Sequence, residues 1–166
     1  MWPKRKSLPS TVWLVWSVEE EIGLKGAEWL ADSLKKANSL PARVHAVDTF
    51  VSSDSPLEDQ RYGDAKLGQG AVVRAVDTSH EAPIEAVRAT LALARREDIP
   101  LQYGVTSGGN DGVPFAERGS INVPLAWPLR YSHSAVEVAD LRDLEALSRI
   151  IIALSKQPAT SDPNLP

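Results

Sequence analysis

The sequence predicts an α/β fold with three layers, α/β/α, around a mixed, largely parallel sheet. Strand-like runs alternate with helix-like runs along the chain, which is typical of this class. Residues 12–16 are apolar at every position, as in a central strand that helices cover on both faces. With 166 residues, of which 43% are hydrophobic, the chain can form the core of one domain. We expect one domain over residues 1–156 and a proline-containing flexible tail over residues 157–166.

The first half of the chain contains two predicted strands, one helix and one loop. Residues 12–18 form the first strand, and residues 26–38 follow as an amphipathic helix with apolar side chains three or four residues apart. Residues 43–48 are predicted as a second strand that ends at Asp48. Residues 51–70 are rich in Ser, Asp, Gly and Pro, which indicates a long and therefore functional loop.

The second half repeats the alternation. Residues 71–76 form a predicted strand, and residues 83–96 a helix with Pro83 in its first turn, where the missing N–H costs little. Residues 101–105 and 121–126 are the next strand candidates. Asp140 is placed to cap a last helix, whose predicted inward face consists of Leu144, Leu147, Ile151 and Leu154.

Composition excludes several classes of partner. The formal net charge of −4 and pI of about 5.4 provide no positive field for nucleic acid or an anionic membrane. The apolar run near the N-terminus is too short for a signal sequence or a membrane span, so we expect a cytoplasmic protein. Because the chain has no cysteine, a metal would be held by His, Asp and Glu, which suits zinc, cobalt or manganese.

Candidate chemical groups follow the ends of the predicted strands. Glu20 and Glu21 follow the first strand, Asp48 ends the second, and His133 follows the last. In open α/β sheets, side chains at the carboxyl ends of strands meet in a common crevice. A Glu, an Asp and a His form a sensible ligand set for a hard cation, with the adjacent Glu free to act as a base.

Each of these residues also has a structural interpretation. An acidic run is often a solvated helix start, and a single Asp is often a turn or capping residue. Other roles are expected for a further group of residues. His45 and His80 are expected to be structural, and Trp13 and Trp16 to lie in the core. Asp111 is expected to cap a turn or short helix, and Arg130 to be either a structural residue or a partner that positions a site residue.

Two segments resemble a known family. Residues 18–27 read VEEEIGLKGA, and residues 128–137 read PLRYSHSAVE, the more discriminating of the two. Residues 46–48, 54–56, 67–70 and 108–112 match in outline, although GGNDG departs from the Gly-Gly-Thr-Asp-Ala of the family. The chain resembles the tetrahedral, or glutamyl and deblocking, aminopeptidases, the two-metal enzymes of the forty-second metallopeptidase family.

This resemblance implies a role for each candidate residue. Glu20 would be the general base, Glu21 and His133 would share one metal, and Asp48 would hold the second metal. The implied activity is the release of N-terminal amino acids from peptides, with two divalent ions such as zinc, cobalt or manganese in the complete site. The implied fold is that of the C-terminal part of the aminopeptidase catalytic domain.

One departure from the family concerns the metal ligands. The family places a His and a bridging Asp upstream of the Glu-Glu block, and these 166 residues contain neither. We therefore expect a partial, truncated catalytic domain with an incomplete two-metal site that binds metal weakly and hydrolyses little. Expected partners are peptide substrates and either a homo-oligomer or a complementing upstream chain. The alternatives are a noncatalytic remnant that acts as a binding or assembly module and, more distantly, a glycosidase.

Overall fold

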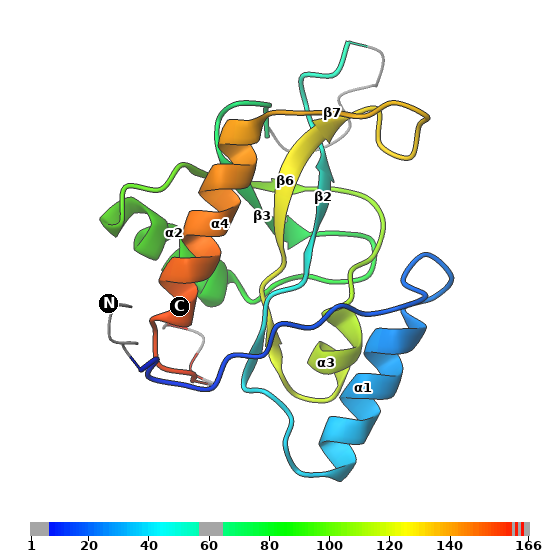
Figure 1. The fold of residues 1–166 in the computed structure, drawn as a ribbon, viewed down its shortest axis with the longest axis vertical. Coiled ribbons are helices and arrows are strands. Elements are labelled where there is room, and N and C mark those ends of the chain that lie inside the picture. The colour runs from blue at the N-terminus through cyan, green and yellow to red at the C-terminus, as the bar shows by residue number, and fades with distance from the viewer. Residues whose placement is uncertain (1–6, 57–64, 161, 163, 165–166) are drawn as a thin grey trace, which may run out of the picture.

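The computed structural model describes residues 7–56, 65–160, 162 and 164 (Figure 1). The elements, in chain order, are α1 (Lys25–Lys36), β1 (Arg43–Val44), β2 (Val47–Val51), β3 (Ala71–Val76), α2 (Ile84–Arg96), β4 (Leu101–Val105), α3 (Val113–Glu117), β5 (Ile121–Asn122), β6 (Leu125–Arg130), β7 (Val138–Ala139) and α4 (Leu141–Ser155).

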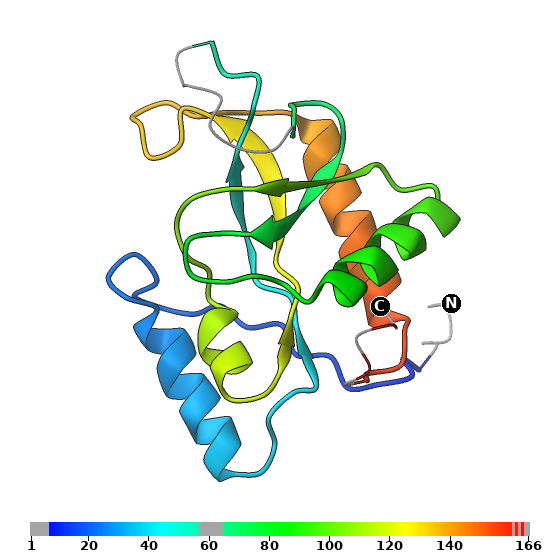
Figure 2. The same ribbon diagram turned by 180° about the vertical axis from the view of Figure 1, so that it is seen from behind.

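The described strands form two sheets. The larger has the order β2-β6-β3-β4, with β7 paired to β6, and β1 and β5 form the smaller. The β2–β6, β3–β4 and β1–β5 pairs are parallel, whereas β3–β6 and β6–β7 are antiparallel. Helices α2 and α4 lie on one side of the larger sheet, and α1 and α3 on the other side of the molecule (Figures 1 and 2). The predicted α/β class with a mixed, largely parallel sheet is confirmed.

The main core lies between the larger sheet and the two helices α2 and α4. Leu125 of β6, Leu93 of α2 and Ile150 of α4 are fully buried in it. A second cluster joins α1 to α3 through Ala27, Ala31 and Phe115. Both helix groups present one apolar stripe to their neighbours, as the spacing of their apolar residues predicts.

Asp140 caps α4 as predicted. Its carboxylate accepts a hydrogen bond from the backbone N–H of Arg142 at 2.9 Å, and the Arg142 guanidinium contacts it at 2.6 Å. The hydrogen bonds from Arg142 lower the pKa of Asp140 to about 2, so the cap is charged at neutral pH.

Loss of this cap should be measurable. We expect Asp140→Ala to lower the urea midpoint of unfolding, because a backbone N–H at the start of α4 loses its partner. Asp140→Asn is the matched control, since its amide oxygen still accepts the bond and should keep most of the stability. Urea denaturation followed by circular dichroism measures both variants, and equal losses for Ala and Asn would contradict the cap.

The first predicted strand is absent. Residues 11–17 are extended but belong to no sheet, and Trp13 and Trp16 are 56% and 84% exposed rather than core residues. An apolar run becomes a strand only if a neighbouring strand pairs with it, and the described part of the chain offers this segment none.

Two predicted strands are each divided. The predicted strand over residues 43–48 consists of β1 and the start of β2, and the strand over residues 121–126 consists of β5 and the start of β6. The chain passes from the smaller sheet to the larger at each break, so Asp48 is the second residue of β2 rather than a strand end. The short helix α3 follows Asp111, where a turn or short helix is predicted, whereas the short strand β7 was not predicted. Among the residues that the structure describes, no helix is long and apolar enough to cross a membrane.

Candidate functional site

The loop that carries Glu20 and Glu21 is folded tightly onto the start of α1. The backbone N–H of Leu24 donates to the Glu20 carbonyl at 2.9 Å, and that of Gly26 donates to the Val18 carbonyl at 3.0 Å. A Cβ at Gly26 would lie 2.6 Å from the Val18 oxygen, so only glycine permits this approach. Gly26 of the motif therefore fixes the position of the acidic residues before it.

The loop that carries His133 lies between β6 and β7. The Glu137 carboxylate accepts a hydrogen bond from the His133 backbone N–H at 2.8 Å, which closes the loop. Arg130, the last residue of β6, contacts Asp54 at 2.6 Å, in line with the structural role expected for it. No role was predicted for Glu137, although it is the last residue of the PLRYSHSAVE motif.

Both loops contain residues with left-handed backbone. Glu19 and Leu24 have φ of 58° and 55°, and Tyr131 and His133 have φ of 65° and 60°. Non-glycine residues rarely adopt this conformation, and they gather at functional sites where the surrounding structure holds them. The sequence gives no signal for this feature.

The structure brings Glu21 and His133 together. The Glu21 Oε1 atom lies 4.0 Å from His133 Nε2, and both side chains are about three-quarters exposed, at 74% and 72%. An oxygen and an imidazole nitrogen at this separation form half of a metal-ligand set for a borderline cation.

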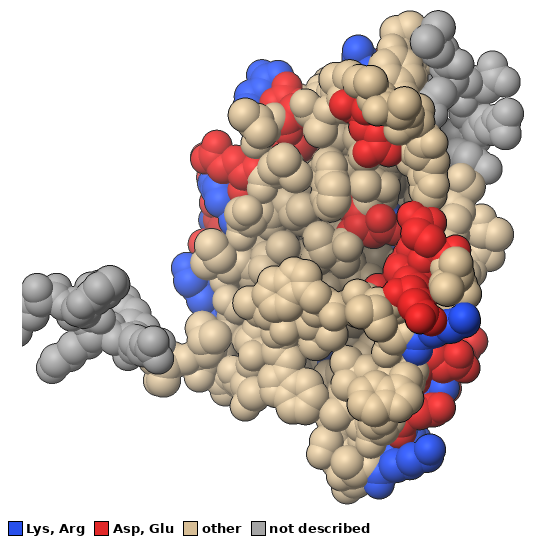
Figure 3. Space-filling model, turned by 45° about the vertical axis from the view of Figure 1, so that its right-hand side comes forward, with Lys and Arg blue, Asp and Glu red and all other residues tan. Residues whose placement is uncertain are grey.

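Glu20 lies among other carboxylates. Its pKa is raised above the ordinary value, first by partial burial and then by the negative charges of Asp48, Glu21 and Asp111, while Arg74 opposes the rise. A carboxyl group whose pKa moves toward neutrality is better suited to accept and return a proton. Figure 3 shows one face on which acidic side chains gather beside a broad uncharged surface.

Asp48 is held by a buried arginine. Its Oδ2 lies 2.5 Å from Arg74 Nη1, and its Oδ1 accepts the Thr49 backbone N–H at 2.6 Å. Arg74 is 3% exposed and also contacts Asp77 at 3.2 Å. Sequence reasoning missed Arg74, because its position inside a strand gave no sign of its partners.

Asp111 does not cap α3. Asn110 Oδ1 accepts the Gly112 backbone N–H instead, while Asp111 accepts a hydrogen bond from the Ser17 hydroxyl. This contact draws Asp111 toward the Glu20 loop. The two histidines expected to be structural hydrogen-bond to backbone carbonyls, His45 to Val123 at 2.9 Å and His80 to Asn122 at 3.1 Å.

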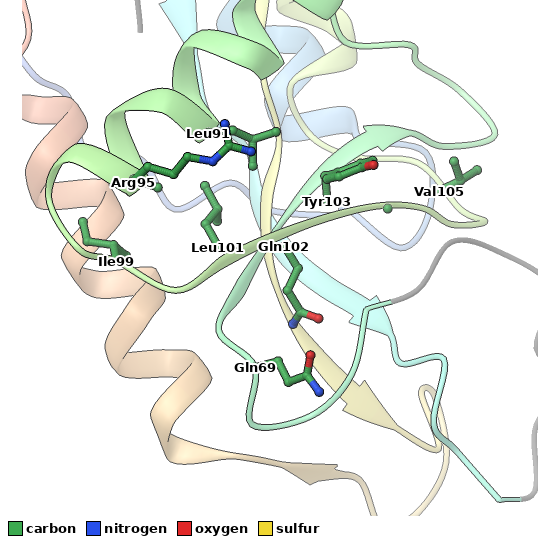
Figure 4. Close-up of a pocket in the computed structure, with 10 residues that line it drawn as sticks. Gln69, Leu91, Arg95, Ile99, Leu101, Gln102, Tyr103 and Val105 are labelled. Carbon is green, nitrogen blue, oxygen red and sulfur yellow. The ribbon is translucent and has the colours of Figure 1, made fainter.

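One pocket lies away from these residues. It has a volume of about 470 Å³ and lies between α2 and the outer edge of β4 (Figure 4). Leu91, Leu101 and Tyr103 line it, and Arg95 is the charged side chain beside it. Because the lining contains no carboxylate or histidine, this pocket is not the place for the predicted proton and metal chemistry.

The residues present fit part of a metal site. Glu21 and His133 face one another, and their oxygen and nitrogen donors suit zinc or cobalt. Within residues 7–56 and 65–160, no group of three or more His, Asp or Glu side chains is arranged to hold an ion. The described chain therefore offers two facing donors, with Asp48 paired to Arg74 nearby.

Comparisons with known proteins show which proteins the chain is similar to. The chain is 35% identical over 146 residues to the putative aminopeptidase FrvX of Escherichia coli K12. This match covers 85% of the chain and 39% of FrvX. The solved TET1 peptidase of Pyrococcus horikoshii is 41% identical with a TM-score of 0.73, over 84% of this chain and 39% of that one. The TET aminopeptidase of Thaumarchaeota archaeon SCGC AB-539-E09 is 25% identical with a TM-score of 0.78, over 89% and 40%.

The chain thus spans about two fifths of the length of these relatives. The family model described as M42 glutamyl aminopeptidase matches residues 3–150, which is most of the chain. Both motif loops lie within the matched range, as does the sheet that positions them. The chain therefore belongs to the M42 glutamyl aminopeptidase family.

Proposed function

We propose that this chain supplies the general base and three metal ligands of an aminopeptidase that acts on peptides. Glu20 is the base, Glu21 and His133 hold one divalent ion, and Asp48 holds the second. The observation that carries this proposal is the 4.0 Å approach of Glu21 to His133, two residues far apart in the sequence, beside a Glu20 whose pKa is raised.

The chemistry divides between the ions and the side chains. Divalent ions supply Lewis acidity toward the first peptide carbonyl of the substrate. Glu20 takes a proton from the attacking water and returns it to the leaving amine, and its raised pKa suits both transfers. Glu137 and Gly26 keep the His133 and Glu20 loops in place. Arg74 positions Asp48 and balances its charge.

Catalytic zinc normally binds about three protein side chains. Glu21 and His133 provide only two donors for the first ion. A complete two-metal site therefore needs donors in addition to those of the described residues, so the chain alone should bind metal weakly and hydrolyse little. The TET1 relative assembles into a tetrahedron or an octahedral shell. By analogy with this relative, we propose that the active form of this chain is also a homo-oligomer.

Calorimetric titration with zinc or cobalt tests the ligand assignment. We expect Glu21→Gln and His133→Asn each to weaken the first binding event by at least about tenfold, because each removes one of two facing donors. Glu19→Gln and His80→Asn are matched controls, since Glu19 contacts Lys25 and His80 a backbone carbonyl. Equal effects of control and site variants would refute the assignment. Two tight sites with rapid hydrolysis of an aminoacyl-nitroanilide by the chain alone would instead refute the proposal that the site is incomplete.

A further inference from the structure

The strand β4 lies at an edge of the larger sheet. Among the residues that the structure describes, it pairs with β3 alone, in parallel, and no strand lies on its outer side. An edge strand presents unpaired backbone N–H and C=O groups to any chain that lies alongside it. Proteins commonly protect such edges with charged side chains or proline, but β4 reads LQYGV and contains neither. Its edge is therefore open to a further strand.

One face of β4 is apolar and only partly covered. Leu101, Tyr103 and Val105 point to the same side of the sheet, because successive side chains of a strand alternate. Leu101 packs against the main core, whereas Tyr103 and Val105 are 64% and 37% exposed. The core thus covers the start of this face and leaves the rest in solvent.

The pocket beside β4 continues this apolar face. Its volume is about 470 Å³, and Leu91 of α2 lines it together with Leu101 and Tyr103 of β4. Figure 4 shows these side chains around the space between the helix and the strand. Ligand pockets of proteins commonly have volumes in this range. We call this pocket, together with the outer edge of β4, the edge pocket.

Arg95 gives the edge pocket a positive charge. Of the three arginines of α2, Arg88 contacts Glu85 at 2.8 Å and Arg96 contacts Glu97 at 3.6 Å. The Arg95 guanidinium lines the pocket and has no such partner among the described residues. Its place in the last turn of α2 also favours a cation, and this interaction with the helix dipole leaves the guanidinium free to bind an anionic group.

Three features together define the occupant of the edge pocket. The open edge requires a polypeptide backbone, the exposed face requires apolar side chains at alternate positions, and Arg95 requires a carboxylate. A small carboxylate would use only Arg95 and leave the edge unpaired. A second copy of this chain, paired β4 to β4, would bring no acidic side chain, since LQYGV has none. An extended acidic peptide satisfies all three requirements.

We infer that the edge pocket binds an extended peptide that adds a strand to the outer edge of β4 and places the carboxylate of an acidic side chain on Arg95. The peptide needs about five residues to match the length of β4. Main-chain hydrogen bonds supply the affinity, while the apolar face and Arg95 supply the sequence preference. The inference goes beyond the proposed function, because binding in the edge pocket requires neither metal nor hydrolysis.

Two peptides, TVTVTET and TETVTVT, test this inference with the full 166-residue chain. In each, two valines and one glutamate lie on one side of an extended chain, and the two orders allow either direction of pairing. An acetyl group and an amide cap the termini, so that the glutamate is the sole carboxylate. We expect calorimetry in EDTA to show binding of at least one peptide. Replacing its Glu with Gln should weaken binding about threefold to fivefold, because water screens the pair with Arg95.

Hydrogen exchange locates the bound peptide. With the peptide at saturation, the outward-facing amides of residues 101–105 should exchange at least about tenfold more slowly, because a new strand pairs with them. The amides of β2 provide the matched control, since β2 lies at the opposite end of the same sheet among the described strands. Their exchange should not change.

Two arginine variants test the charge. Arg95→Met should remove the preference for the glutamate peptide over the glutamine peptide. Arg96→Met is the matched control, because Arg96 is the next residue of α2 and contacts Glu97 rather than the pocket. This variant should retain the preference. Both arginines are exposed, so both variants should keep the urea midpoint of the natural chain.

Several results would overturn the inference: no binding of either peptide, unchanged exchange at residues 101–105 when peptide is bound, or a glutamate preference that survives in Arg95→Met. Self-association that slows exchange at residues 101–105 without peptide would assign the edge to a second copy and overturn it as well. Peptide binding by a chain that binds no zinc would instead overturn the proposed function and leave the edge pocket established.

Discussion

Replacing Arg74 with methionine should lower the free energy of unfolding by about 3–5 kcal/mol. The guanidinium is 3% exposed and contacts Asp48 at 2.5 Å, Asp77 at 3.2 Å and the Gly109 carbonyl at 2.8 Å. The Asp77 side chain is itself buried, so its carboxylate would remain in the interior without a cation. Breaking a buried pair from one side costs this much because the remaining charge is uncompensated.

The chain offers a matched control for this prediction. Arg88 contacts Glu85 at 2.8 Å, but both side chains are exposed, at 66% and 45%. Arg88→Met should therefore change the stability by less than about 0.5 kcal/mol, since water screens the pair. Urea denaturation of the two variants measures the difference. Comparable small losses for both would show that Arg74 does not carry a buried ion-pair network.

Acid should destabilise the protein through His45. The environment of His45 lowers its pKa from 6.5 to about 4, because burial disfavours the charged imidazolium. The folded state then binds fewer protons than the unfolded state, so stability is complete above pH 6.5 and is lost as the pH falls toward 4. The expected loss from this residue at pH 4 is about 2–3 kcal/mol.

Two measurements isolate this contribution. His45→Asn keeps a donor for the Val123 carbonyl but does not titrate, so the stability difference between this variant and the natural chain should change by about 2–3 kcal/mol between pH 7.5 and pH 4. The chain has three histidines, which makes the imidazole titration readable by NMR. A His45 resonance that titrates near pH 6.5 would contradict the prediction.

Much of the candidate site follows from local sequence. The acids of residues 18–27 and the histidine of residues 128–137 lie in motif loops, and the glycine and glutamate within these motifs hold the loops in shape. Arg74 and Asp111 join the same site from β3 and from the turn before α3, through contacts between segments distant in the chain. No local pattern signals such contacts, so sequence reasoning missed Arg74 and assigned Asp111 to a cap.

The sequence by itself determined the α/β class, the long helices and the chemical identity of the motif residues. Helix periodicity and capping are properties of neighbouring residues, so α2, α4 and the Asp140 cap were predictable. Strand formation depends on a partner strand. Tertiary structure therefore decided that residues 43–48 and 121–126 divide between two sheets, and that residues 11–17 pair with no strand among the residues that the structure describes. The apolar pattern of that segment records only a tendency to form a strand, because a strand also needs a neighbouring strand to pair with.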